Sequence, residues 1–108
     1  MILSLDTTET KNIFVELRSL DGKTIAKLSE NQQQGSQALL PMIMKILKKN
    51  KFTLKNISKI EVNPGPGSFT GTRVGVSVAN ALSFALQVPV NGKKGKIVLP
   101  IYDKSKFD

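Results

Sequence analysis

The chain has 108 residues and a formal net charge of +8, and it contains neither cysteine nor histidine. Its length suits one domain, and 40% hydrophobic with 6% aromatic residues predicts an aliphatic core. The composition excludes disulfides, thiol catalysis and the commonest general base and metal ligand, so we expect no cofactor and no metal. The positive charge favours nucleic acid, acidic protein or anionic lipid as a partner, or a solvated lysine-rich surface.

Residues 1–30 carry the pattern of a three-stranded meander. "MILSLD" is a short apolar run, and "NIFVELRSL" alternates apolar and polar residues, as a half-buried strand does. "LDGK" predicts a hairpin because Asp-Gly supplies the positive φ of a tight turn, and "KTIAKLSE" is the third strand. The start resembles neither a secretory signal nor a membrane span, so we expect a cytoplasmic protein that does not contact membranes.

"QALLPMIMKILKKN" predicts a first helix that ends near Asn50, with Pro41 close to its start. Its apolar residues span roughly 200° around the helix axis at 100° per residue, whereas one sheet-facing stripe needs little more than 100°. The helix therefore has apolar surface for its own sheet and for a partner. We assign Leu39, Met42 and Ile46 to the partner.

"ISKIEVNPG" predicts a fourth strand, a second helix runs from near Ser68 or Thr70 to near Gln87, and "VPVNG" predicts a short fifth strand. The order βββαβαβ contains two strand-to-helix crossovers. It predicts an α/β domain with a mixed sheet of about five strands and two main helices.

The loop "NPGPGSFTG" between the fourth strand and the second helix has two interpretations. A glycine-rich loop at a helix start can present backbone N–H groups to a phosphate. This loop, however, lacks the lysine of a Walker A motif and the glycine spacing of a dinucleotide fingerprint. Alternatively, Pro64 and Pro66 stiffen the exit from the strand while Ser68 or Thr70 caps the helix.

The second helix has three kinds of surface. A row of small residues, with close packing against another helix as its expected role, comprises Gly71, Gly75, Ala79 and Ser83. The row expected to face the sheet comprises Val74, Val78, Leu82 and Ala85. The remaining arc, which we assign to a partner, comprises Arg73, Val76, Ser77, Asn80 and Phe84.

"NPGPGSFTGTRVGVSVANALSFAL" strongly resembles the signature of the TsaB family, and "ILSLDTTET", "QALLPMIMKIL" and "VPVNG" resemble further family segments in the same order. The resemblance implies an actin-like/RNase H-like fold. It also implies a non-catalytic role in synthesis of threonylcarbamoyladenosine in tRNA, beside the catalytic paralogue TsaD and the ATPase TsaE. In the family, the two helices after the third and fourth strands form the pairing surface, which agrees with the apolar surfaces predicted above.

Family members usually have two domains of this kind, whereas this chain has about half the expected length. We interpret it as a single domain with a core at 1–92, the joint "KKGK" at 93–96 in place of the second domain, and a closing segment at 97–108. Thr72 replaces a larger apolar residue of the family. In ATP-hydrolysing relatives the turn formed here by Asp6, Thr7 and Thr8 contacts metal and phosphate, together with loops of the second domain.

We therefore interpret a vestigial phosphate loop at Asp6, Thr7, Thr8, Gly65, Gly67 and Ser68, in which Asp6 forms an Asx-type cap. The first functional hypothesis is a non-enzymatic partner of a TsaD-like enzyme, with a TsaE-like ATPase as a third component and a homodimer in isolation.

Two alternatives stay open. One is a small RNA-binding module, because residues 31–60 hold six lysines and no acid. Since the chain has only two arginines and one tyrosine, we expect its contact with tRNA to be indirect or weak and salt-sensitive. The other is a nucleotide-binding enzyme that uses Asp6 and the loop from Gly65 to Gly71.

Overall fold

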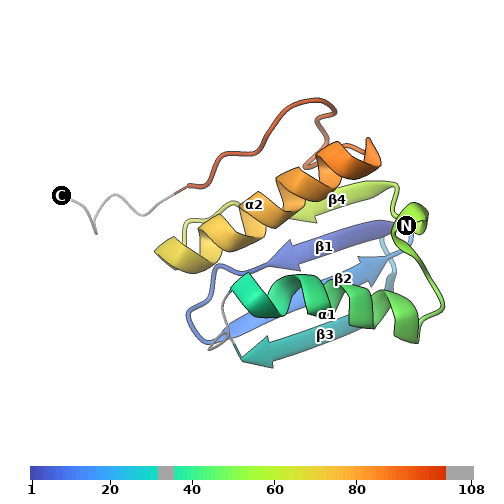
Figure 1. Cartoon of the computed structure of the whole chain (residues 1–108), viewed down its shortest axis with the longest axis horizontal. Coiled ribbons are helices and arrows are strands. Elements are labelled where there is room, and N and C mark those ends of the chain that lie inside the picture. The colour runs from blue at the N-terminus through green and yellow to red at the C-terminus, as the bar shows by residue number, and fades with distance from the viewer. Residues whose placement is uncertain (32–35, 102–108) are drawn as a thin grey trace.

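The computed structural model describes residues 1–31 and 36–101. Its four strands are β1 (Ile2–Asp6), β2 (Asn12–Arg18), β3 (Thr24–Asn31) and β4 (Lys59–Val62). They form one mixed sheet in the order β3-β2-β1-β4, in which β1 pairs with β4 in parallel and the other neighbours are antiparallel. Helices α1 (Ser36–Lys49) and α2 (Phe69–Leu86) lie on the same face of this sheet, and η2 (Leu54–Asn56) is a short 3-10 turn (Figure 1).

This architecture confirms the α/β class, the meander and the two helices. The predicted fifth strand is reduced to one parallel bridge between Val90 and Ile60. Pro89 has no N–H to donate, and Asn91 and Gly92 have positive φ angles of 50° and 80°, so the chain turns away from β4 directly after Val90.

Within the described residues, no helix is long and apolar enough to cross a bilayer.

The core lies between the sheet and its two helices. Leu3 and Leu5 of β1, three residues of β2 and Ile60 of β4 alternate toward this side, and all are buried. The α1 residues that meet them are Leu39, Met42, Ile43, Ile46 and Leu47, each at most 3% exposed. Burial of one such side chain contributes about 1.5–3 kcal/mol, so α1 stabilises the fold mainly through this stripe.

The burial corrects the sequence interpretation of α1. Leu39, Met42 and Ile46 were assigned to a partner, but they lie in the chain's own core and have no surface left to contact one. The wide apolar arc has a different outward part, formed by Leu40 and Met44, which are 47% and 46% exposed.

The buried face of α2 is also different from the expected one. Val76 and Ala79 are 3% and 0% exposed, whereas Ala85 is exposed and the side chains of Val74, Val78 and Leu82 are partly buried. The inward face is therefore the row of small residues together with Val76. Its neighbour is the turn after β1, because a Cβ placed on Gly75 would clash with Oγ1 of Thr7. The small residues admit this turn, where we had expected another helix.

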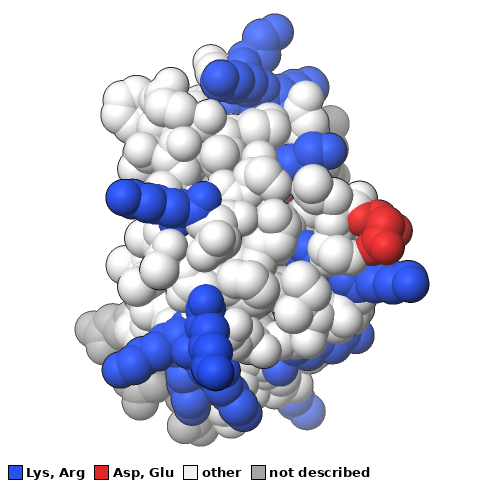
Figure 2. All heavy atoms as spheres, turned by 90° about the vertical axis from the view of Figure 1, so that its right-hand side faces the viewer, with Lys and Arg blue, Asp and Glu red and all other residues white. Residues whose placement is uncertain are grey.

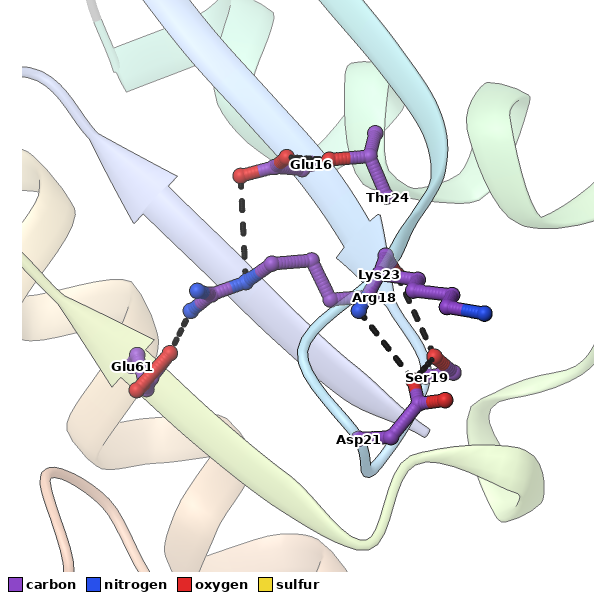
Figure 3. Close-up of polar contacts among 7 residues, drawn as sticks. All are labelled: Glu16, Arg18, Ser19, Asp21, Lys23, Thr24 and Glu61. Atoms are coloured by element: carbon purple, nitrogen blue, oxygen red, sulfur yellow. Dashed lines mark hydrogen bonds and ion pairs between the residues drawn. The ribbon is translucent and has the colours of Figure 1, made fainter.

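The opposite face of the sheet carries charges that neutralise one another. Arg18 of β2 extends across β1 and forms an ion pair with Glu61 of β4, and its Nε lies 3.8 Å from Glu16 (Figure 3). Glu16 also accepts a hydrogen bond of 2.6 Å from Thr24. This network joins the antiparallel part of the sheet to the parallel part on the side that the helices leave uncovered.

We predict that Gly75→Ala destabilises the fold although alanine favours a helix by about 1 kcal/mol over glycine. Overpacking of a tight contact costs about 1–3 kcal/mol, and the atom met here belongs to a buried turn. The free energy of unfolding in urea should fall by about 1 kcal/mol or more. Ser77→Ala, on the exposed side of the same helix, is the control and should change it by less than about 0.5 kcal/mol.

A double-mutant cycle separates this contact from a general effect on the helix. With Thr7→Ala the clashing oxygen is gone, so the double variant should lose less stability than the sum of the two single variants. Strict additivity would show that the contact between Thr7 and Gly75 does not limit the approach of α2 to the sheet.

Candidate functional site

Asp6 ends β1 and organises the turn that follows it. Its Oδ1 accepts hydrogen bonds from the backbone N–H of Thr8 at 2.9 Å and from the Thr8 hydroxyl at 2.7 Å. Its Oδ2 accepts from Nδ2 of Asn63 at 3.2 Å. This is the geometry of an Asx-type turn. Both carboxylate oxygens are therefore engaged with the chain itself.

The glycine-rich loop lies against this turn. The N–H of Ser68 donates to the carbonyl of Thr8 at 2.7 Å, and the N–H of Gly65 donates to Oδ1 of Asn63 at 3.1 Å. A Cβ on Gly67 would lie 2.5 Å from the Cβ of Thr8, so only glycine fits there. The backbone N–H groups of Thr8, Gly65 and Ser68 thus all donate hydrogen bonds within the chain, and these three are not directed at a phosphate.

Ser68 caps α2, as one of the two sequence interpretations held. Its hydroxyl accepts a hydrogen bond from the N–H of Gly71 at 3.3 Å. The carbonyl of the same Gly71 accepts a bond from the Thr7 hydroxyl at 2.5 Å. Thr7 is fully buried, so this bond satisfies a hydroxyl that would otherwise be costly to bury. The residues of the predicted phosphate loop are brought together, but as a mutually bonded turn.

The closing segment runs along α2. Asn80 donates its Nδ2–H to the carbonyl of Val98 at 2.9 Å, and its Oδ1 accepts from the N–H of Val98 at 2.8 Å. The N–H of Ile101 then donates to the carbonyl of Pro64 at 2.6 Å. Asn80, which we had assigned to a partner, is thus bonded to the chain's own backbone. Residues 102–108 of this segment lie outside the described residues.

Gly65 is the point where the loop and the closing segment touch. Its φ is +104°, a conformation that favours glycine, and a Cβ there would clash with the carbonyl of Ile101. The sequence therefore needs glycine at this position for its backbone angle and for its lack of a side chain.

The remaining assigned partner residues differ in exposure. Val76 is buried in the core, which corrects its assignment, because it points toward the sheet. Arg73 and Ser77 are exposed. They line a shallow hollow of about 320 Å³ on the outer side of α2, together with Thr70, Val74 and Val78. Phe84 is 80% exposed near the C-terminal end of α2.

Two exposed residues of α1 add to the exposed residues on the outer side of α2. Leu40 and Met44 were not assigned to the partner from the sequence, although a spacing of four residues places them on one side of a helix. α1 and α2 contact each other and lie side by side on one face of the sheet (Figure 1). We call their exposed residues Leu40, Met44, Arg73 and Ser77 the helical face.

Sequence reasoning also missed the roles of Asn63 and Asn91. Asn63 bridges Asp6 and Gly65. Asn91 accepts from the N–H of Val62 at 2.8 Å and donates to its carbonyl at 3.0 Å. The available signal was their position beside Pro or Gly in turns, where asparagine commonly bonds to backbone groups.

The chemistry of the site follows from these bonds. Among the described residues, no group of three or more His, Cys, Asp or Glu side chains could hold a metal ion. Asp6 is bonded to Thr8 and Asn63, and the N–H groups of Ser68 and Gly65 are bonded to Thr8 and Asn63 as well. The arrangement is suited to fix α2 and the loop relative to the sheet.

Comparison with known proteins gives consistent matches. A model of the family "TsaD: tRNA N6-adenosine threonylcarbamoyltransferase" matches residues 26–92. The tRNA threonylcarbamoyladenosine biosynthesis protein TsaB of Buchnera aphidicola subsp. Schizaphis graminum is 41% identical over 71 residues, which are 65% of this chain and 34% of that protein. The protein of the same name from Escherichia coli is 34% identical over 91 residues, or 84% of this chain and 38% of that protein.

A solved structure supports the fold. "YeaZ from Pseudomonas aeruginosa" superposes with a TM-score of 0.74 at 32% identity, covering 94% of this chain and 44% of that one. The chain thus spans about a third of the length of these two curated relatives. The matched residues include both helices, β4 and the loop described above. By its sequence and its fold, the chain belongs to the TsaD family and, within it, to the TsaB proteins.

Proposed function

We propose that this chain is a non-catalytic subunit that binds a TsaD-type tRNA N6-adenosine threonylcarbamoyltransferase and so supports the synthesis of threonylcarbamoyladenosine in tRNA. The names of the TsaB relatives support the pathway. The structural use of Asp6 supports the non-catalytic role, because both of its oxygens are held by Thr8 and Asn63. A TsaE-like ATPase would act on the pair.

The helical face is the proposed contact surface. Leu40 and Met44 are about half exposed on α1, and the hollow on α2 adds apolar area between Arg73 and Ser77. At about 25 cal/mol per Å² of apolar surface, burial of a few hundred Å² contributes several kcal/mol before the cost of association. In isolation, the same face would pair two copies of this chain as a homodimer.

The domain organisation that we propose has a core at 1–92, a joint at 93–96 and a closing segment at 97–108. The bonds of Asn80 to Val98 and of Ile101 to Pro64 support it, because they hold the start of the closing segment on α2 without a second domain in between. The helical face is then presented by one domain.

We predict that Leu40→Glu with Met44→Glu weakens binding to the TsaD-type protein of the same cell by at least tenfold. Two carboxylates would replace apolar contact area at the centre of the interface, and a tenfold loss corresponds to about 1.4 kcal/mol. Sedimentation and pull-down of the two purified proteins measure the effect, and self-association of the chain should weaken in parallel.

The matched control for this experiment is Leu20→Glu with Ile25→Glu. These residues are 64% and 41% exposed at the β2–β3 hairpin and carry the same change in charge. The proposed face is wrong if both double variants bind the partner equally well.

We predict that Asp6→Ala lowers the free energy of unfolding by about 1–2 kcal/mol, as loss of a capping carboxylate does. Asp6→Asn should lose less stability, because its Oδ1 still accepts hydrogen bonds from Thr8.

Turnover of Mg-ATP by the parent chain should stay at background. Turnover that survives purification and disappears in both variants would instead support the nucleotide-binding enzyme.

A further inference from the structure

One end of the molecule gathers the lysines of residues 48–59 and Lys93. It is the end at which β1 and β4 begin and α1 finishes (Figure 1). Figure 2 looks onto it and shows basic side chains around a largely uncharged centre, with acidic atoms at one edge. We define the basic end by six exposed lysines, Lys48, Lys49, Lys51, Lys55, Lys59 and Lys93.

The fold brings these residues together. Lys48 and Lys49 form the last turn of α1, and Lys55 lies in η2, which touches the start of β1 through a bond from Met1 to Asn56. Lys59 opens β4 beside Ile2. Lys93 is bridged to Val90, which is bridged in turn to Ile60. Residues 48–59 and Lys93, which lies 34 positions beyond Lys59, thus share one surface.

The lysines of the basic end are not neutralised by neighbouring acids. In the described chain, ion pairs join Arg18 to Glu16 and Glu61, and Lys45 to Glu30. Across the parts of the chain that the structure describes, none of the six lysines has a carboxylate within ion-pair distance. Their mutual repulsion is compatible with the fold, and it would be relieved by an anionic partner.

The acid at this end is engaged in its own hairpin. Asp21 lies in the turn between β2 and β3 and accepts hydrogen bonds from the Ser19 hydroxyl and from the N–H of Lys23 (Figure 3). The Ser19 hydroxyl and then the Lys23 backbone lower the pKa of Asp21 below its ordinary value. Asp21 thus stays ionised and bonded within its own hairpin, and it forms no ion pair with the six lysines.

We propose that the basic end binds the phosphate backbone of folded RNA without reading its sequence. Lysine is a flexible point charge that contacts phosphates but lacks the fork with which arginine reads bases, and A-form RNA presents its phosphates in a regular array. The apolar residues among these lysines do not favour a membrane. Ile57 is buried, and Phe52 and Leu54 are partly buried and line a hollow between the lysines, so they do not form a projecting wedge for a bilayer.

The basic end adjoins the helical face, because Met44 lines one hollow with Lys48, Lys51 and Lys55. The two surfaces share no residue, and RNA binding at the basic end does not require the proposed function. The test uses the full chain, a fluorescent tRNA transcript and a series of salt concentrations. The parent chain should bind at low salt and lose affinity steeply between about 50 and 200 mM salt.

The informative variant is Lys48→Gln with Lys55→Gln, and its control is Lys11→Gln with Lys27→Gln, which removes the same charge from exposed sites elsewhere. Each lost phosphate contact lowers the slope of log K against log salt by about 0.7–0.9. We therefore expect the first variant to lose roughly 1.5 in slope and the control to keep the parent slope. Binding to the TsaD-type protein should stay unchanged in both, which separates this test from that of the helical face.

Three results would overturn the proposal. One is absence of tRNA binding at low salt. Another is an equal loss of slope in both variants, which would mean that net charge alone attracts RNA. The third is stronger binding to phosphatidylserine vesicles than to tRNA, lost selectively in the first variant, which would make the basic end a membrane-contact surface.

Discussion

The contact of Thr7 with α2 is the constraint on which the other parts depend. Thr7 is fully buried, bonds to the carbonyl of Gly71 and lies directly against Gly75. Because interiors are close-packed, this contact sets how near α2 approaches the sheet. The glycine loop is then confined between α2 and the turn after β1, where Gly67 meets Thr8.

Two asparagine side chains form hydrogen bonds with backbone groups that have no partner in a strand. Asn91 bonds to both the N–H and the carbonyl of Val62, and the backbone around it occupies the N–H and the carbonyl of Ile60. The outer edge of β4 is thereby covered without a full strand, which removes a site for unwanted strand pairing. Asn80 does the same for Val98, and so the closing segment is bound to a helix by a side-chain amide.

The surfaces of the molecule differ in charge and polarity. The outer side of the sheet is charged but neutralised by Arg18 and its two glutamates. The helical face exposes apolar side chains, and the basic end exposes uncompensated lysines. A protein with its charges and apolar groups arranged in this way is suited to bind other macromolecules through its surfaces. The bonded turn at Asp6 supports those surfaces by fixing α2.

Sequence alone determined the order of the first four strands and the two helices, the α/β class and the family, because period-two and helical patterns, turn residues and the loop signature are all local. It also indicated that Ser68 or Thr70 caps α2 and that Asp6 forms an Asx-type turn, since a cap needs only the residues that follow it. The failures came from contacts between distant segments. The arc of α1 did not reveal which part of it was covered, so Leu39 and Met42 were taken for a partner surface although they are buried.

The small-residue row of α2 likewise signalled a close approach, but only the tertiary structure showed that the approaching group is Thr7. Asn80 could not be assigned to the closing segment, because Val98 lies 18 residues away in sequence. The sequence also did not show where the lysines lie in space. Only the tertiary structure places Lys93 at the same end of the molecule as the lysines that follow α1. Local patterns fix which elements form, whereas burial and charge clustering depend on how these elements meet in space.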